Sequence, residues 1–399
     1  MCSFRPVVVW AAVLFSTNGL VSAQTTQPSD RAWMIQRFDQ QFLPQIRQSL
    51  SQPIDNGSGG IAWGHSYQLA ALVEMLEATA DPKYAEAFVE LAKAVIQARD
   101  DRHDRQDQLR NRVVKGWGSV KYSGNRHFVW AVHTGMIIEP MARFYPVVNS
   151  DPRLQASFRA DAVAFLQVAI ESDAVHDDEF RQGPGPDEGY LFGLFLNKHL
   201  PLNQQNALAR AWLWLADATG DPKYLDKARR LAAFFKKRIR TTDDGAYVWE
   251  YWPPLDGAGD GFEDVSHAAI NADFLVRCAE RGIVFDAADV TRLEKTFLAR
   301  VLPDPQTVSD TLAGADGTSR YRYAPFFWAR LAQHNPVVRE RLLAFCRFGA
   351  ADRTCSPSEA LGLAMLVRAV SQSQAAPESA TQPAIQPTTQ PNTAPAGTR

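Results

Sequence analysis

The feature that most constrains the fold is a four-residue motif that returns at a constant spacing of 70 residues. It reads Asp-Pro-Lys-Tyr at 81–84, Asp-Pro-Arg-Leu at 151–154 and Asp-Pro-Lys-Tyr at 221–224. The first and third copies also share the preceding residues, Ala-Thr-x-Asp. A repeat with a fixed period indicates one structural unit that is used several times.

Each copy of the motif is expected to start a helix. Asp suits the N-cap, and Pro is tolerated at the first helical position, where its missing N–H costs no hydrogen bond. Apolar residues recur with helical spacing before the first copy, as at Tyr67 and Leu72, and after it, as at Phe88, Leu91 and Val95. The unit is therefore predicted to be a helix, a short turn and a second helix.

Further helices bring the predicted total to about twelve. Strand signals are confined to short pieces such as 246–249. Long loops rich in aromatic and charged residues separate the hairpins, which favours a closed ring over an open solenoid. The predicted fold is an all-α (α/α) toroid, or barrel, of about six to seven helical hairpins in a single domain. The additional helices are expected at 265–281, 287–301, 323–333, 336–348 and 357–371.

Both ends of the chain are predicted to lie outside this domain. Residues 1–23 carry Arg5, an apolar run and a terminal Val-Ser-Ala, which is the pattern of a secretory signal peptide. Residues 373–399 are rich in Pro, Gln, Thr and Ala, so we expect a disordered tail. The toroid is thus predicted over 24–372, in a periplasmic or secreted protein that is not inserted in the membrane after signal removal.

Charge, cysteines and motifs exclude several functions. A formal net charge of -2 gives no general attraction to nucleic acid, which usually requires a basic excess. No paired Cys or His spacing predicts a metal site, and a disulfide between Cys346 and Cys355 is left open. The chain has no G-x-S-x-G, P-loop or H-E-x-x-H motif, so serine hydrolase, nucleotide-dependent and zinc protease chemistry lack support.

Aromatic residues beside the predicted loops are the first candidates for ligand binding. Their rings stack on sugar faces while their polar edges stay hydrated. Others among the ten tryptophans, such as Trp212, lie on apolar helix faces and are expected in the core. The candidate substrate contacts are Trp63, Tyr67, Trp117, Asn125, His127, Trp130, His133, Tyr190, Trp252, Arg322 and Tyr323.

Two segments carry candidates for proton transfer. His267 follows Asp264 at a predicted helix start, where the helix dipole disfavours the imidazolium and leaves a ring that can exchange protons. Alternatively, Asp264 or Ser266 caps the helix and His267 merely packs. In the Arg-Tyr-Arg-Tyr segment at 320–323, the arginines are expected to lower the pKa of the neighbouring tyrosines, so that one of them acts as a base. The other interpretation is a solvated basic loop.

Two further polar residues stand out. Glu250 lies between Trp249 and Tyr251, where apolar neighbours would raise the pKa of its carboxyl and allow it to donate a proton. Asn203 opens the helix that precedes the third repeat, where an N-cap role is the simplest explanation.

These segments together resemble the α/α-toroid polysaccharide lyases of the alginate and glucuronan lyase type. The resemblance covers residues 63 to about 367, and it rests on the Ala-Thr-x-Asp-Pro-Lys-Tyr repeats and on 200–203, 247–252, 263–267 and 319–321. It implies β-elimination without a metal or another cofactor. Such enzymes neutralise a uronate carboxylate, and a Tyr, sometimes with a His, then removes the C5 proton and protonates the glycosidic oxygen.

The resemblance also implies residue roles. Asn203, Glu250 and Arg320 would neutralise the carboxylate, and His267 would be a further neutraliser or a second base. Tyr321 would be the base and acid, with Tyr323 or Tyr190 as substitutes.

The predicted function is therefore an exported lyase that acts on an acidic polysaccharide, a β-1,4-linked polyuronate such as alginate (polymannuronate) or glucuronan. A toroidal glycoside hydrolase acting on uronic-acid-containing oligosaccharides is the first alternative, with two carboxylates taken from Glu250, Asp264 and Asp187. A non-catalytic glycan-binding protein is the second alternative.

Overall fold

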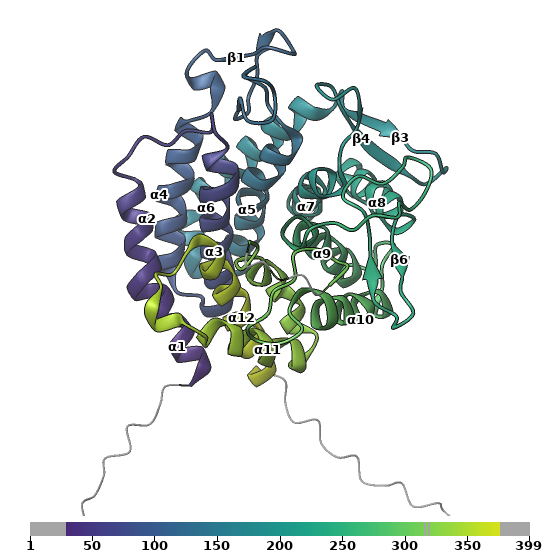
Figure 1. The fold of residues 1–399 in the computed structure, drawn as a ribbon. Helices are drawn as coiled ribbons and strands as arrows, with labels where there is room; N and C mark the ends of the chain where they lie inside the picture. The colour runs from purple at the N-terminus through teal and green to yellow at the C-terminus, as the bar shows by residue number, and fades with distance from the viewer. Residues whose placement is uncertain (1–28, 315–316, 318–319, 376–399) are drawn as a thin grey trace, which may run out of the picture.

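The computed structural model describes residues 29–314, 317 and 320–375 (Figure 1). Twelve α-helices lie within these residues, with short 3₁₀ and π turns between some of them. The predicted signal peptide at 1–23 and residues 376–399 of the predicted tail lie outside the described part of the chain. No helix in the described part is long and apolar enough to cross a membrane.

Six helical segments form the inner layer of the molecule. They are α3 (Ser66–Thr79), α5 (Ala131–Ser150), α7 (Leu202–Thr219), α9 (Val265–Glu280), the 3₁₀ helix η6 (Ala324–Gln333) and α12 (Pro357–Ala375). Each segment contacts the next one in this order, and α12 contacts α3, so the ring is closed. Figure 1 shows this closure, because the last helix of the chain returns beside α3.

A second layer of helices packs around this ring. It consists of α1 (Asp30–Arg37), α4 (Pro82–Gln97), α6 (Pro152–Asp173), α8 (Pro222–Lys236), α10 (Ala287–Thr296) and α11 (Pro336–Arg347). The helices α4, α6, α8, α10 and α11 each pack on the inner segment that precedes them in the chain, and α1 packs on α12. The short α2 (Leu43–Ser49) packs against α4. The predicted (α/α) toroid is confirmed, with six hairpins, of which the last is closed by the two ends of the chain.

The repeated motif starts three outer helices, as predicted. The carboxylates of Asp81, Asp151 and Asp221 accept a hydrogen bond from the backbone N–H two residues later, at 3.1, 2.8 and 3.0 Å. Proline occupies the first helical position in α4, α6 and α8. The motif therefore recurs because α4, α6 and α8 begin with the same cap.

The residues just before two of these caps, Ala80 and Gly220, occupy equivalent positions and allow the cost of a left-handed backbone to be measured. The helices α3 and α7 end at Ala80 and Gly220, which both adopt left-handed backbone, with φ values of 54° and 69°. Gly220→Ala is expected to lower the free energy of unfolding by about 1 kcal/mol, because a Cβ is disfavoured in this conformation. A Cβ at Gly220 would meet no atom within 4 Å, so the cost lies in the backbone. Ala80→Gly should raise the same quantity, and chemical denaturation that moved both variants in one direction would contradict this.

The second half of the chain departs from prediction only in local geometry. The predicted helix at 287–301 is α10 followed by a π turn (Phe297–Val301), and the one at 323–333 has 3₁₀ geometry. The helix α12 extends to Ala375, three residues beyond the predicted end of the domain.

Short strands occupy the loops between hairpins. The predicted strand at 246–249 corresponds to β7 (Tyr247–Val248), which pairs in antiparallel fashion with β6 (Arg240–Thr241). The other strands are β1 (Gln106–Asp107), β2 (Arg112–Val113), β3 (Phe180–Gln182), β4 (Gly189–Gly193) and β5 (Lys198–His199).

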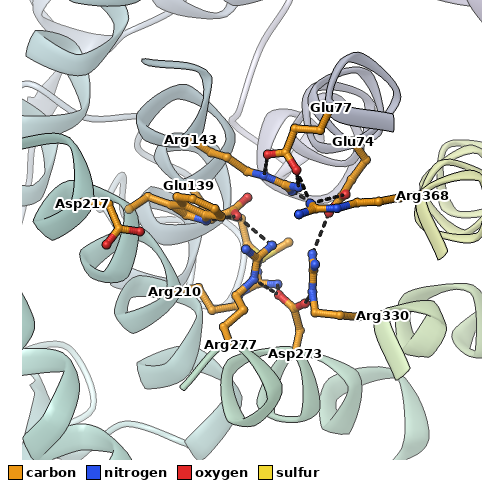
Figure 2. A network of polar contacts seen from close by, with 12 residues as sticks. Glu74, Glu77, Glu139, Arg143, Arg210, Asp217, Asp273, Arg277, Arg330 and Arg368 are labelled. Atoms are coloured by element: carbon orange, nitrogen blue, oxygen red, sulfur yellow. Dashed lines mark hydrogen bonds and ion pairs between the residues drawn. The ribbon is translucent and has the colours of Figure 1, made fainter. Parts of the chain in front are cut away.

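A network of buried charges fills the ring toward the C-terminal half of the inner helices (Figure 2). The carboxylate of Glu74 forms ion pairs with Arg143 at 2.5 Å and with Arg330 at 2.6 Å. Asp273 pairs with Arg277 at 2.8 Å and also with Arg330. Glu77, Glu139, Arg210 and Arg368 are further members, and Asp217, also labelled in Figure 2, pairs with Arg281 at the exposed edge of the network. Since every one of the six inner segments contributes a member, the network ties the whole ring together.

The described cysteines form no disulfide. Cys346 and Cys355, for which a bridge was left open, are free and buried, as is Cys278.

Candidate functional site

A cleft lies at the N-terminal ends of the inner segments. Tyr67, Asn203 and His267 lie in the first turns of α3, α7 and α9, and all three line this cleft. Charged residues of the network follow about two turns later on the same helices. Each of these helices therefore contributes one residue to the cleft lining and another to the charge network beneath the cleft. Helix N-termini carry partial positive charge, so their convergence favours an anionic ligand.

The cleft consists of two adjoining cavities that share Trp63, Tyr122 and His267. The first, which we call the Tyr323 lobe, is also lined by Tyr67, Lys121, Ser266, Ile270, Tyr323, Phe327 and Ser358. The second, the Asn203 lobe, is also lined by Trp130, Leu196, Pro201, Asn203, Gln204, Tyr251 and Trp252.

His267 is held in place by Asp264, the N-cap of α9. The carboxylate accepts hydrogen bonds from the backbone N–H groups of Ser266 and His267, both at 3.0 Å, and its second oxygen lies 2.5 Å from His267 Nδ1. Burial alone would raise the pKa of Asp264, but these hydrogen bonds and the His267 ring keep it below its ordinary value. The expected cap is confirmed at Asp264, which also holds the His267 ring through Nδ1, while a role of His267 in proton exchange stays a prediction.

Tyr251 is the nearest phenol to His267 by ring contact. The two ring centroids are 5.3 Å apart, and both side chains line the Asn203 lobe. Burial raises the pKa of Tyr251 to about 12, although a hydrogen bond with Gln204 acts in the opposite direction. The phenol therefore keeps its proton at neutral pH and is suited to donate it.

Asn203 is a buried side chain with unused hydrogen-bonding capacity. It lies inside the first turn of α7, where Pro201 is the N-cap, so it does not cap the helix. Asn203 is 2% exposed, and its Oδ1 has no hydrogen-bond partner within the described part of the chain. Gln204 Oε1 and the indole N–H groups of Trp63 and Trp130 are also buried and also lack a hydrogen-bond partner within the described part of the chain. Unsatisfied buried polar atoms are costly, so their concentration around one lobe indicates a site for a polar ligand.

A buried acid supports the wall behind this lobe. Glu263 is fully buried, and burial raises the pKa of its carboxyl well above the ordinary value. It accepts hydrogen bonds from the indole of Trp249 and, at 2.7 Å, from Asn271 Nδ2. Asn271 in turn accepts one from Asn206 Nδ2 at 2.7 Å, which links α9 to α7. Glu263 therefore links α9 to α7 through Asn271 and Asn206, while the adjacent Asp264 contacts His267.

The cleft carries positive charge. Lys121 lines the Tyr323 lobe with its Nζ 5.2 Å from the ring centroid of Tyr122, and it forms no ion pair with a described residue. No Asp or Glu is among the described residues that line either lobe. Across 29–314, 317 and 320–375, no group of three or more His, Cys, Asp or Glu side chains is arranged to hold a metal ion.

Several predicted residues come together here. The lining includes Trp63, Tyr67, Trp130, Trp252 and Tyr323 together with Asn203 and His267. Their contact with a substrate stays a prediction.

His133 lies behind this lining. Its ring centroid is 5.7 Å from that of Trp63 and 6.4 Å from that of Tyr122. Burial lowers its pKa to about 3, so the ring is neutral.

Other predicted substrate contacts lie elsewhere. Trp117 is buried in the core, where its indole N–H donates to a backbone carbonyl at 2.8 Å. His127 Nε2 lies 2.9 Å from Asp100 Oδ2, and this contact raises the pKa of the imidazole. Tyr190 packs on outer helix α8 through Phe234, and Asn125 is exposed in a left-handed turn with φ 66°. None of these four residues lines the cleft.

The structure also places Tyr321 outside the cleft lining. It packs against the core, with its ring centroid 6.3 Å from that of Tyr323, which does line the cleft. The expected lowering of the Tyr321 pKa is wrong. Burial and the negative charge of Asp264 raise it, and they outweigh the opposing effect of Arg320.

Glu250 and the arginines of the 320–323 segment are also outside the lining. The Glu250 carboxylate packs against Gly259 and Gly261, where an added Cβ would collide with it. Arg320 and Arg322 line a separate groove that adjoins the cleft at Tyr323.

Ten lining residues were not among the predicted ones: Lys121, Tyr122, Leu196, Pro201, Gln204, Tyr251, Ser266, Ile270, Phe327 and Ser358. Tyr122 is 56% exposed and has left-handed backbone with φ 69°, which is unusual for a residue with a Cβ. In the sequence, the only feature that points to Tyr122 as a lining residue is its position in a loop rich in aromatic and charged residues. Its unusual backbone is visible only in the folded chain.

Comparison with known proteins supports the fold. No protein-family model and no curated protein sequence matches the chain. Among solved structures, an inactive variant of an α-1,6-mannanase from Salegentibacter sp. HEL1_6, in complex with α-1,6-mannotetrose, aligns at 12% identity, with a TM-score of 0.52 over 86% of this chain and 98% of that one. Cellobiose 2-epimerase from Spirochaeta thermophila DSM 6192 aligns at 13% identity and TM-score 0.53, over 86% and 96% of the two chains. A D-mannose isomerase aligns at 12% identity and TM-score 0.53, over 87% and 100%. The chain therefore shares the α/α-toroid fold of these proteins.

Proposed function

We propose that this chain is an exported polysaccharide lyase that cleaves a β-1,4-linked polyuronate, such as alginate or glucuronan, by β-elimination. The observation that carries the proposal is the pairing of His267 and Tyr251 beside Asn203, in a lobe whose described lining has no Asp or Glu and which adjoins the lobe lined by Lys121. The compared proteins support a sugar ligand for this fold, because an α-1,6-mannanase, a cellobiose epimerase and a mannose isomerase share it.

The first requirement of this reaction is neutralisation of the uronate carboxylate. A proton on the carbon next to an ionised carboxylate is only weakly acidic, because its removal concentrates negative charge. In the proposed reaction the Asn203 side chain and the helix N-termini stabilise that charge in the Asn203 lobe, and the Lys121 ammonium adds positive potential from the adjoining Tyr323 lobe. Groups fixed in place before the reaction can stabilise such charge by several kcal/mol.

The second requirement is a pair of groups that move protons. In the proposed reaction, His267 Nε2 takes the C5 proton, and the electrons of the C5–H bond form the C4–C5 double bond. The C4–O bond breaks, and the leaving oxygen takes the phenolic proton of Tyr251. Proton transfer from the resulting imidazolium to the phenolate restores both groups. Asp264 supports this cycle because its negative charge stabilises the imidazolium.

The hydrolase alternative requires two carboxylates on either side of the scissile bond, and its candidate acids are poorly placed for this. Glu250 packs on its own loop, Asp264 is engaged by His267, and Asp187 is exposed between β3 and β4. One of the compared structures is a mannanase, so the experiment below also tests for hydrolysis.

The deciding experiment is incubation of the purified protein with alginate, glucuronan and a neutral β-1,4-glucan. A lyase produces the ultraviolet absorbance of a C4–C5 double bond together with new reducing ends. A hydrolase produces reducing ends without this absorbance, and a binding protein produces neither. Either of the last two results would reject the proposal.

Tyr251→Phe is expected to lower kcat for polyuronate by a factor of about 10² to 10⁴, because it removes the proton donor but keeps the ring. KM should change little, since the phenolic O–H acts mainly in the transition state. The matched control is Tyr321→Phe, which removes the same hydroxyl from a tyrosine outside the cleft and should retain most of the activity. A larger loss in Tyr321→Phe than in Tyr251→Phe would return the acid role to Tyr321.

A further inference from the structure

We infer that the groove lined by Arg320, Arg322, Tyr323, Phe348 and Arg353 is a distal subsite that binds an anionic sugar further along the polymer. This groove, which we call the arginine groove, lies outside the two lobes that would hold the reacting sugars. The identity of the polymer rests on the proposed function, whereas the binding of a polyanion rests on the groove itself.

The arginine groove is continuous with the cleft. Tyr323 lines both the groove and the Tyr323 lobe. Its hydroxyl lies 3.2 Å from Ser266 Oγ, next to His267 in the chain. A polysaccharide that leaves the reaction centre through the Tyr323 lobe therefore passes over Tyr323 into the groove.

Two arginines in the groove are available for a ligand. Arg320 and Arg322 are exposed, and neither forms an ion pair with a described residue. Both guanidinium groups lie over aromatic rings: Arg320 is 5.0 Å from the ring centroid of Tyr321, and Arg322 is 5.4 Å from that of Phe348. Stacked guanidinium groups keep their N–H edges free, and those edges match the geometry of a carboxylate.

Arg353 has a different role in the same groove. It donates to Glu359 at 2.9 Å and to the backbone carbonyl of Cys346 at 2.8 Å. Glu359 also accepts from the buried Arg37 at 2.7 Å. Arg353 is therefore part of a rigid wall, and the positive charge available to a ligand comes from Arg320 and Arg322.

The groove also offers aromatic surface. Tyr323 and Phe348 are each 41% exposed, which is high for large rings beside a cleft. Exposed rings next to unpaired arginines suit an acidic sugar, since the ring stacks on the apolar sugar face while the guanidinium binds the carboxylate. The ligand class is therefore a polyuronate long enough to reach beyond the cleft.

This inference predicts that the two arginines affect long substrates more than short ones. In the double variant Arg320→Gln/Arg322→Gln, the loss of kcat/KM on long polyuronate should exceed the loss on a trimer by about tenfold, mostly through KM. Raising the salt concentration should reduce this difference. The control is Arg159→Gln/Arg229→Gln, which removes the same charge from exposed positions on α6 and α8 and should keep the polymer activity.

A binding measurement separates this inference from the proposed function. Calorimetric titration of long polyuronate into the wild-type protein and into Arg320→Gln/Arg322→Gln should give an affinity about tenfold weaker for the variant. If the wild-type protein binds the polymer in this arginine-dependent way without cleaving it, the lyase proposal fails and the subsite stands. Equal losses on trimer and polymer, or equal affinities in the titration, would overturn the subsite.

Discussion

Replacement of His267 by alanine is expected to lower kcat for polyuronate cleavage by a factor of about 10² to 10⁴, the usual contribution of a positioned general base. His267 lines both lobes, and its Nδ1 is engaged by Asp264 at 2.5 Å, so Nε2 has a defined direction into the cleft. Alanine leaves no group there to take the C5 proton. The measurement is the initial rate of absorbance increase at saturating substrate.

The variant Asp264→Asn tests whether the charge of Asp264 supports His267. Asparagine is as good an N-cap as aspartate, so the start of α9 and the stability of the protein should be retained. The variant loses the charge that stabilises the imidazolium, so kcat should fall while the melting temperature stays near that of the wild-type protein. The surface substitution His334→Ala is the control, because His334 pairs with Glu280 away from the cleft. Full activity in His267→Ala would move the base to another cleft residue and reject the proposed mechanism.

The fold was predictable because its signals are local. The N-caps Asp81, Asp151 and Asp221 act within two residues of their own position, and the proline beside each one confirms the helix start. Closure of the ring was inferred from long loops and hairpin number, and the structure supplies the contact of α12 with α3 that completes it. The 3₁₀ geometry of η6 was not predicted, because apolar periodicity does not separate it from an α-helix over ten residues.

The cleft lining was predictable where helix starts or aromatic-rich loops mark it. His267 and Asn203 stand at such starts, and both were identified. Tyr251 was not, because Glu250 and Tyr251 are adjacent and the sequence does not tell which one turns inward. That choice is made by tertiary contacts: the backbone carbonyl of Tyr251 accepts from Leu202 N at 3.2 Å, which docks it at the start of α7. The position of Tyr321 outside the cleft has the same origin, since Tyr321 and Tyr323 lie in one irregular turn and their directions are fixed only once the turn is folded.

The charge network was not predicted for a similar reason. Glu74 lies within a mostly apolar helix, and its arginine partners come from α5, η6 and α12, far away in the sequence. A buried carboxylate with partners from three other segments is a property of the closed ring.

Glu74→Gln is expected to lower the free energy of unfolding by about 3–5 kcal/mol, the typical cost of removing one partner from a buried ion pair. The amide keeps the shape but leaves Arg143 and Arg330 buried with less negative charge between them. Chemical denaturation measures the change. The control is Asp217→Asn, which breaks an ion pair with Arg281 at 2.6 Å on a surface where the Asp217 side chain is 41% exposed, and which should cost less than about 1 kcal/mol.

The pH dependence of this effect has a defined sign. Burial alone would raise the pKa of Glu74, but Arg143, Arg330 and Arg368 hold it well below the ordinary value of 4.5. A carboxyl whose pKa is lower in the folded state contributes stability that is complete above its unfolded pKa and is lost as the pH falls toward the folded pKa. The stability difference between wild type and Glu74→Gln should therefore be constant from neutral pH down to about pH 5 and shrink below it. A difference that stayed the same at pH 3 would mean that Glu74 stabilises the ring by shape, and not by its charge.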